Sequence, residues 1–388
     1  MQNPFPLCLG APAAFATVRE FLAQASFDEP HVCAALKLDH IGQLIEPARD
    51  GLYLDALPPA LAFAIRVFVQ GARATARESR AAGGEAVFDA FRALGLLREE
   101  AGALVSPVWL YPVDGFLIVS DRHCDPAGRP IAPTPDAVFA ACFEGTLHFL
   151  RLLPCAQKGE ALDLCGGTGI GALHLSRTAR RAVTSDVNAR AAHFAAFNAR
   201  LNGAAVESLC GDLYETVRGR QFDLISCHPP YLPAGGDVSL ARDGGETGEA
   251  ITRRTIEGLP AHLRPGGLCL IATLGGDGVD APFERRVQAW LGAAAAEFAI
   301  VFGMLHTRSL AEVMAGIARR GADGDDAEAA ARAARLRAHG LLRYVYGALL
   351  LERLPRPAAP PPLRVPLSPE SGIEALLAAR ARTPSPPA

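Results

Sequence analysis

The chain has 388 residues, half of them hydrophobic, which is enough to form two packed domains and excludes a largely disordered protein. Its formal net charge is −3, so the protein as a whole is not attracted to phosphate backbones or to anionic membranes. The nine cysteines include no C-x-x-C pair, which indicates buried thiols in a reducing compartment and argues against a disulfide framework or a zinc site.

Signals for targeting and for membrane insertion are missing from the sequence. The amino terminus has no basic segment followed by an apolar core, and no stretch of about 18 uninterrupted apolar residues occurs. We therefore expect a cytoplasmic protein with no membrane contact and no bound metal. These features predict no particular oligomeric state.

The first 128 residues are predicted to form a mainly helical domain. Residues 12–75 show helical periodicity and include a dense apolar run at 57–69, which is typical of a buried helix. A helix at 85–95 followed by a strand pair up to residue 120 resembles a winged-helix unit. Because that helix offers only Arg92 as a basic side chain, we expect a substrate-shaping or dimerising domain and not a DNA-binding one.

A proline-rich segment at 125–135 is expected to lead into a second domain over residues 129–354. Strand and helix signals alternate there, which predicts an α/β fold with a parallel sheet covered by helices on both faces. The expected strands are 161–164, 182–186, 206–210, 222–227 and 268–273, and the expected helices are 168–178, 189–202 and 249–263.

The remaining sequence is expected to add two strands to the sheet and then to form a tail outside it. Strands at 298–305 and 341–351 are predicted to form an antiparallel pair at the sheet edge, with helices at 311–319 and 327–338 inserted between them. Residues 355–388 are rich in proline and polar residues. We expect them to form a mobile tail that contains a short helix-capable stretch at 370–379.

Three carboxylates at the ends of successive strands favour one kind of cofactor. The first strand ends in a glycine-rich turn that opens a helix, and Asp163 lies just before the glycines, where it suits a cationic amino group but not a pyrophosphate. Asp186 ends the second strand, where it can accept hydrogen bonds from ribose hydroxyls, and Asp212 follows the third, where it can meet an adenine amino group. Carboxylates without a phosphate partner favour S-adenosylmethionine over a nicotinamide dinucleotide.

A second motif follows the strand at 222–227, where the sequence is His228-Pro229-Pro230-Tyr231. The two prolines lack amide donors, so this segment is stiff and cannot join a strand ladder. The aromatic ring beside it is suited to stacking on a flat polar group. The motif therefore predicts a rigid surface on which the flat polar group of a substrate can lie.

These segments together resemble class I S-adenosylmethionine-dependent methyltransferases, and more narrowly the group that includes release-factor glutamine methyltransferases and adenine amino-methyltransferases. The resemblance covers roughly residues 135–273 and implies a Rossmann-like sheet of seven strands. The cofactor-binding residues that it implies are Asp163, Cys165, Gly166, Gly167, Thr168, Gly169, Asp186, Val187, Asn188, Asp212 and Leu213. Cys165 stands where the family has its first glycine.

The resemblance also implies an acceptor site made of His228, Pro229, Pro230 and Tyr231. Family members carry Asn or Asp before Pro-Pro-Tyr/Phe, and the Asn side chain and a prolyl carbonyl accept hydrogen bonds from a planar amine. His228 replaces that Asn in this sequence. A neutral imidazole can position the acceptor by accepting one hydrogen bond, or it can remove a proton near neutral pH, and both roles remain open.

We therefore expect a methyltransferase that uses S-adenosylmethionine to N-methylate a small molecule or a protein side chain. A nucleic-acid acceptor, such as an adenine amino group, is a less favoured alternative because the charge is modest. A non-catalytic regulatory protein that binds the cofactor is the other alternative. His174, His193, His262 and His306 share no metal-ligand spacing, and the pairs Arg253-Arg254 and Arg285-Arg286 are expected to be solvated helix faces.

Overall fold

The computed structural model describes residues 5–46, 54–154, 159–233, 239–319 and 326–382. The chain forms two compact units, each built from several segments. The first unit contains Met1–Leu147, Gly166–Arg177 and Ala182–Cys210, and the second contains His148–Cys165, Thr178–Arg181 and Gly211–Ala388. This division differs from the boundary expected near residue 128. Among the described residues, no helix is long and apolar enough to cross a membrane.

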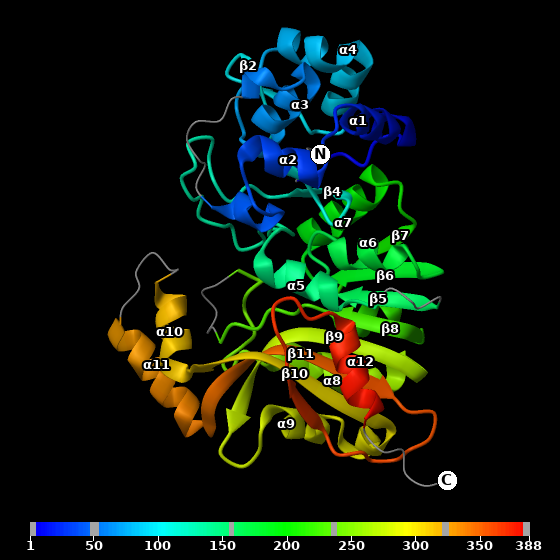
Figure 1. The fold of residues 1–388 in the computed structure, drawn as a ribbon, viewed down its shortest axis with the longest axis vertical. Coiled ribbons are helices and arrows are strands. Elements are labelled where there is room, and N and C mark those ends of the chain that lie inside the picture. Colours follow the sequence, from blue (N-terminus) through cyan, green and yellow to red (C-terminus); the bar gives the residue numbers. More distant parts are fainter. Residues whose placement is uncertain (1–4, 47–53, 155–158, 234–238, 320–325, 383–388) are drawn as a thin grey trace. The chain divides into compact units, whose positions relative to one another are not determined.

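The first unit joins the helical amino-terminal region to two strands of the expected α/β region (Figure 1). Its elements are α1 (Pro12–Gln24), α2 (Glu29–Leu36), α3 (Pro59–Ala64), α4 (Ala76–Ala93), β1 (Arg98–Glu100), β2 (Ala103–Val105), β3 (Trp109–Val113), β4 (Phe116–Ser120), α6 (Ile170–Ser176), β6 (Arg181–Asp186, from Ala182 onward), α7 (Ala189–Leu201) and β7 (Val206–Cys210). The predicted strand pair is confirmed as the antiparallel hairpin of β3 and β4. Strands β6 and β7 pair in parallel, as expected.

Aromatic packing and two amide side chains hold this unit together. Phe15 of α1 contacts Phe197 of α7, with ring centroids 5.0 Å apart. On α7, the Asn198 amide accepts a hydrogen bond from Val119 N–H at 2.8 Å and donates to the Val119 carbonyl at 3.0 Å. Asn202 bonds Leu117 of β4 in the same way. Asn198 on α7 and Asn202 directly after it thus bond the backbone of β4, which explains why these segments form one unit.

The second unit carries the longer strands and the carboxyl-terminal third of the chain. Its elements are α5 (Glu144–Leu152, from His148 onward), β5 (Glu160–Leu164), β8 (Phe222–Cys227), α8 (Ala250–His262), β9 (Leu263–Gly278), α9 (Phe283–Trp290), β10 (Phe298–Ser309), α10 (Leu310–Ala318), α11 (Asp326–Ala338), β11 (Leu341–Arg353), β12 (Leu363–Pro366) and α12 (Ile373–Ala381). The strands lie in the order β12-β10-β11-β9-β8-β5. Strands β5, β8 and β9 are parallel, whereas β11 is antiparallel to both β9 and β10.

The segment after Pro355, which we expected to be a mobile tail, contains β12 and α12. Strand β12 pairs in parallel with β10 and adds one strand to the seven expected, so β10 and β11 do not form the sheet edge. Gly303 of β10 explains the close packing, because a Cβ there would lie 2.4 Å from Leu367 and 2.6 Å from Leu376 of α12. Residues 383–388 lie outside the described part of the chain.

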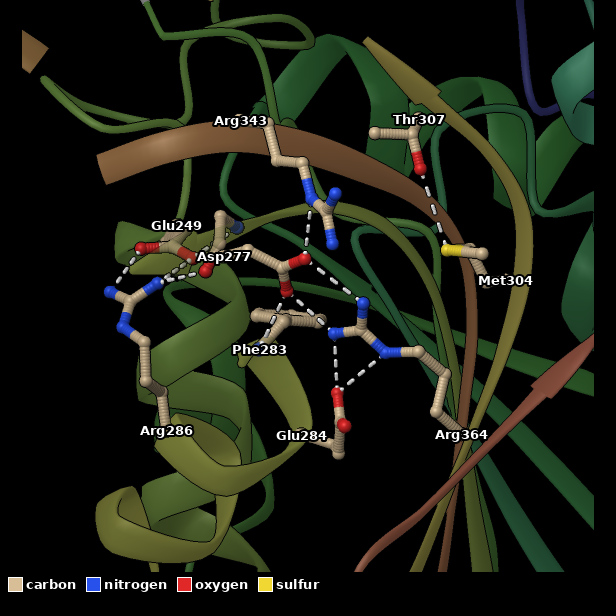
Figure 2. A network of polar contacts seen from close by, with 10 residues as sticks. Glu249, Asp277, Phe283, Glu284, Arg286, Met304, Thr307, Arg343 and Arg364 are labelled. Atoms are coloured by element: carbon tan, nitrogen blue, oxygen red, sulfur yellow. Dashed lines mark hydrogen bonds and ion pairs between the residues drawn. The ribbon is translucent and has the colours of Figure 1, made fainter. Parts of the chain in front are cut away.

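A buried ion-pair network connects β12 to the rest of the second unit (Figure 2). Asp277 at the end of β9 accepts hydrogen bonds from Arg343 of β11 at 2.9 Å and from Arg364 of β12 at 2.6 Å. Burial acts to raise the pKa of Asp277, but the hydrogen bonds from Arg364, the Phe283 amide and Arg343 outweigh it and lower the pKa to about 2. The carboxyl-terminal strand is therefore held by charge as well as by its ladder.

Candidate active site

The glycine loop in the first unit has the backbone shape that its sequence predicts. Gly167 and Gly169 have φ values of 55° and 79°, in the left-handed region that glycine adopts at little cost. At Gly169 a Cβ would lie 2.8 Å from the Cβ of Ala195 on α7, so close packing requires glycine there. At Gly167 a Cβ would meet nothing within 4 Å, so open space borders the loop at that point.

Cys165, just before this loop, also has a left-handed backbone, with φ of 56°. This conformation costs an ordinary residue about 1–2 kcal/mol and a glycine almost nothing. Cys165 therefore has a backbone conformation that favours glycine, the residue that the family resemblance implies at this position.

Asp186, at the end of β6, is held by two backbone amides. Its Oδ2 accepts a hydrogen bond from Gly167 N–H at 2.9 Å, and its Oδ1 accepts one from Asn188 N–H at 2.9 Å. Burial raises the pKa of this carboxyl, while the two amide hydrogen bonds oppose the shift. Since a carboxylate has about four acceptor positions, Asp186 retains the capacity to accept from ribose hydroxyls. Its predicted role remains a prediction.

The two residues after Asp186 differ in what they do. The Asn188 side chain accepts from Arg190 N–H at 2.9 Å and so caps α7, and its amide donates to the Asp136 carbonyl at 2.8 Å. The Val187 side chain is exposed. Asn188, and not Asp186, is therefore the helix cap at this strand end.

In the second unit, Asp163 and Asp212 have side-chain partners of their own. Asp163 on β5 is buried and accepts a hydrogen bond from Ser226 Oγ of β8 at 2.6 Å. Asp212 forms an ion pair with Arg254 of α8 at 2.7 Å, and both side chains are partly exposed. Leu213 follows in a left-handed conformation and is buried. Arg254, expected to lie on a solvated helix face, is thus the partner of a candidate cofactor residue.

His228 lies between two aromatic rings of the second unit. Its ring centroid is 5.3 Å from that of Phe149 on α5 and 5.8 Å from that of Tyr231, with interplanar angles of 30° and 25°. Burial, and secondarily the nearby His148, lower the pKa of His228 to about 4. The imidazole is therefore neutral at neutral pH, although part of its surface remains accessible.

The segment after the Pro-Pro-Tyr motif folds back onto it. Leu232 N–H donates to the Arg242 carbonyl at 3.0 Å, and Gly244 N–H donates to the Leu232 carbonyl at 2.9 Å. Gly248 has φ of 81°, and a Cβ there would lie 2.5 Å from the carbonyl oxygen of Tyr231. We call residues 228–233 and 239–248 the acceptor loop. Residues 234–238, between these two segments, lie outside the described residues.

A buried ion pair anchors the end of the acceptor loop (Figure 2). Glu249 is buried and accepts hydrogen bonds from Gly276 N–H at 2.8 Å and from both terminal nitrogens of Arg286 at 2.7 Å. The expectation that Arg286 belongs to a solvated helix face is therefore wrong, whereas its neighbour Arg285 is exposed. Sequence reasoning missed Glu249 and the pairing of Arg286 with it. The only signal was an acidic residue directly after Gly248.

Three of the other histidines named from the sequence have ordinary hydrogen-bond partners. His174 bonds Asp114 at 2.8 Å, His193 bonds the Leu7 carbonyl at 3.0 Å, and His262 bonds the Arg220 carbonyl at 3.0 Å. Among the described residues, no group of three or more His, Cys, Asp or Glu side chains is placed to hold a metal ion.

The glycine loop, the acidic strand ends and the proline-stiffened acceptor loop, on an α/β fold, define a Rossmann-like methyltransferase. A family model described as "Methyltransferase small domain" matches residues 135–280. A candidate protein N5-glutamine methyltransferase of Methanocaldococcus jannaschii is 33% identical over 33% of this chain and 68% of its own length. The ribosomal protein uL3 glutamine methyltransferase of Bradyrhizobium diazoefficiens is 30% identical over 57% of this chain and 70% of its own.

The release factor glutamine methyltransferase of Xylella fastidiosa is 36% identical over 30% of this chain, and the match spans about half of that relative, 48% of its length. The chain belongs to the class I S-adenosylmethionine-dependent methyltransferases, in the group of the release-factor and ribosomal-protein glutamine methyltransferases. It is therefore an enzyme that transfers methyl groups and uses S-adenosylmethionine. The non-catalytic alternative is not supported.

Proposed function

We propose that this enzyme N-methylates the side-chain amide of a glutamine in a protein acceptor held at the acceptor loop. The relatives that the chain matches over two thirds of their length or more are named for glutamine methylation. The acceptor motif differs from the family pattern at one position, where His228 replaces Asn. The observation that carries the proposal is the neutral, ring-packed state of that histidine.

The cofactor-binding residues form part of the same proposal. Open space at Gly167 and the free acceptor capacity of Asp186 fit a ligand with ribose hydroxyls. The Asp163 and Asp212 carboxylates suit an ammonium group and an amino group. We assign cofactor binding to Asp163, Cys165, Gly166, Gly167, Thr168, Gly169, Asp186, Val187, Asn188, Asp212 and Leu213.

When bound, S-adenosylmethionine supplies a methyl group on a positively charged sulfur, so the protein needs only to place the acceptor nitrogen and accept one proton. Neutral His228 can accept a hydrogen bond from the amide N–H, as the family's Asn does, and Tyr231 can stack on the planar amide. An amide nitrogen that has gained a methyl group and still holds its proton is a far stronger acid than an imidazolium. A ring with a pKa of about 4 therefore suffices to accept that proton.

His228→Asn and His228→Ala test this proposal. We expect His228→Asn to retain methyl transfer to a glutamine-containing protein within about tenfold, and His228→Ala to lose roughly 100-fold, the effect of removing a positioned hydrogen-bond partner. Because the wild-type ring stays neutral well above its pKa of about 4, the wild-type rate should be flat between about pH 6 and pH 8 if His228 alone controls it. Mass spectrometry of the methylated acceptor measures these rates. His31→Ala, at an exposed histidine, is the control variant.

Two results would contradict the proposal. Equal rates for His228→Ala and the wild type would leave the imidazole without a role in catalysis. A methylated adenine, found instead of a methylated glutamine when both protein and RNA are offered, would move the acceptor to the nucleic-acid class. Calorimetric titration with S-adenosylmethionine and with S-adenosylhomocysteine checks the cofactor independently, since both should bind in either case.

A further inference from the structure

The helices α10 and α11, inserted between β10 and β11, lie side by side (Figure 1) and form a hydrophobic cluster with residues from the start of β11. The buried members of this cluster are Leu274, Leu310, Val313, Met314, Ala329, Ala333, Leu336, Leu341, Tyr344 and Tyr346. Tyr231 of the acceptor loop packs against the same cluster. The insertion therefore shares a hydrophobic core with the aromatic residue of the acceptor motif.

Polar contacts also tie this insertion to the acceptor loop. Arg332 of α11 donates to the Pro233 carbonyl at 3.1 Å, and the Tyr344 hydroxyl donates to the Thr247 carbonyl at 2.9 Å. His339, just after α11, lies 3.0 Å from Glu246. Both described segments of the acceptor loop are thus in contact with the insertion or with the residues that follow it.

A row of ring contacts runs from the acceptor motif to the start of the insertion. Tyr231 contacts Tyr346 with centroids 5.7 Å apart, and Tyr346 stacks on His306 with centroids 5.1 Å apart. His228 lies at the other end of this row, beside Tyr231. His306, near the end of β10, is therefore only two ring contacts away from Tyr231.

His306 also lines a surface cavity of about 680 Å³ between the end of β10 and α10. This volume lies within the usual range of ligand sites. The exposed residues Arg308 and Arg319 also line this cavity, together with the small residues Ala311 and Ala315. Glu312 also lines the cavity, but its carboxylate is engaged in a capping box with Ser309, from whose N–H it accepts at 2.7 Å.

The charge of this cavity is therefore positive. Glu312 interacts electrostatically with Arg308, and its one negative charge offsets only one of the two positive charges of Arg308 and Arg319. Arginine forms paired hydrogen bonds with carboxylates, which makes such a cavity a receptor for acidic side chains. Two arginines on a chain of net charge −3 are few for a nucleic-acid surface, which needs a longer array of basic groups.

We propose that this cavity binds an acidic segment of the acceptor protein close in sequence to the glutamine that is methylated. The inference rests on the proposed function, because it assigns to the same acceptor loop a neighbouring site that selects the protein. The insertion and the strands on either side of it would then have two tasks. Arg332 of α11 and Tyr344 of β11 hold the acceptor loop, and Arg308 of β10 and Arg319 at the end of α10 bind the acceptor protein.

Peptide binding to the full-length protein tests the proposal. The probe is a fluorescent peptide with one glutamine flanked by glutamates, and its matched control has serine at every glutamate position. By fluorescence anisotropy in low salt, we expect the acidic peptide to bind at least tenfold more tightly and to lose this advantage as salt is raised. The double variant Arg308→Glu, Arg319→Glu should abolish the preference, whereas Arg356→Glu, at an exposed arginine elsewhere in the unit, should keep it.

The outcomes separate this inference from the proposed function. A preference that is absent, or that survives the double variant, overturns the assignment of the cavity. So does tighter binding of a single-stranded RNA of equal charge through the same two arginines. Mass spectrometry of the two peptides with S-adenosylmethionine gives the second readout. Equal methylation of both overturns the inference and leaves the proposed function standing, whereas an arginine-dependent preference without methylation supports the cavity and removes glutamine as the acceptor.

Discussion

The glycine loop of the first unit and the acceptor loop of the second are stabilised over very different distances along the chain. Gly167 donates to Asp186, 19 residues away, and Gly166 donates to the Ser185 carbonyl. The acceptor loop, in contrast, receives a hydrogen bond from Arg332, 99 residues from its partner Pro233. The ion pair that anchors its end joins Glu249 to a helix 37 residues further on.

This difference has a consequence for function. A loop held by contacts to a nearby part of the chain depends less on distant segments, which suits a binding site for the cofactor that the family shares. A loop held by segments far away in the sequence changes when those segments change, so the acceptor can be altered without altering the cofactor site. Substitutions that act on only one of the two loops therefore test whether the glycine loop and the acceptor loop are independent.

The largest effect is expected for Arg286→Ala, which removes the partner of buried Glu249. Leaving a buried carboxylate unpaired costs about 3 kcal/mol of the free energy of unfolding. The end of the acceptor loop then loses its anchor, and we expect the KM for the acceptor protein to rise while the affinity for S-adenosylmethionine stays within about twofold. Denaturant unfolding and steady-state kinetics measure the two effects.

Arg285→Ala is the matched control, because Arg285 lies on the same helix, is exposed and bonds only Gln288, at 3.3 Å, among the hydrogen bonds found. It should change neither stability nor kinetics, as expected for a surface side chain. If Arg286→Ala weakened cofactor binding as strongly as acceptor binding, the two loops would not be independent, and the comparison would fail.

Most of the strands could be predicted from the sequence, because buried strands are apolar runs with clear ends. Strands β7 and β8 begin and end where they were predicted. Strand β12 was missed because it is only four residues long, in a proline-rich segment, and ends at Pro366, which is tolerated at a sheet edge. Its stability comes from pairing with β10 and from Arg364, neither of which composition can indicate.

The residues of the candidate site also fall into those that the sequence could predict and those that it could not. The glycine loop and Asp186 were predictable, since turn glycines and strand-end carboxylates are local signals. Glu249, Arg286 and Arg332 were not, because a charged residue in an amphipathic helix has the same pattern whether it faces solvent or a distant partner. The neutral state of His228 depends on its environment in the folded unit, which its own sequence neighbours do not specify.

A smaller effect, confined to the affinity for the cofactor, is expected for Gly167→Ala. The left-handed backbone at this position costs alanine about 1 kcal/mol, and the added methyl group points into the open space beside the loop. Gly219→Ala is the matched control, since Gly219 also has a positive φ and open space around it but lies in a turn outside the candidate site. Calorimetry should show S-adenosylmethionine binding weakened roughly tenfold or more by Gly167→Ala and unchanged by Gly219→Ala, with similar losses in Tm. Equal affinities for both variants would remove Gly167 from the cofactor site.

The smallest effect is expected for Arg332→Ala, which removes one hydrogen bond to the acceptor loop and leaves the hydrophobic cluster of the insertion intact. One such bond to a charged donor contributes about 1.5 kcal/mol, so the KM for the acceptor should rise by roughly tenfold at most, with kcat and cofactor affinity nearly unchanged. Arg332→Lys keeps a donor and should restore part of the affinity, whereas Arg335→Ala, at an exposed position of the same helix, should have no effect.

A fall in kcat with no change in KM would mean that Arg332 acts on the chemical step and not on acceptor binding. The acceptor loop would then be as closely coupled to the reaction as the glycine loop, and the division between a shared cofactor region and an adaptable acceptor region would have to be abandoned.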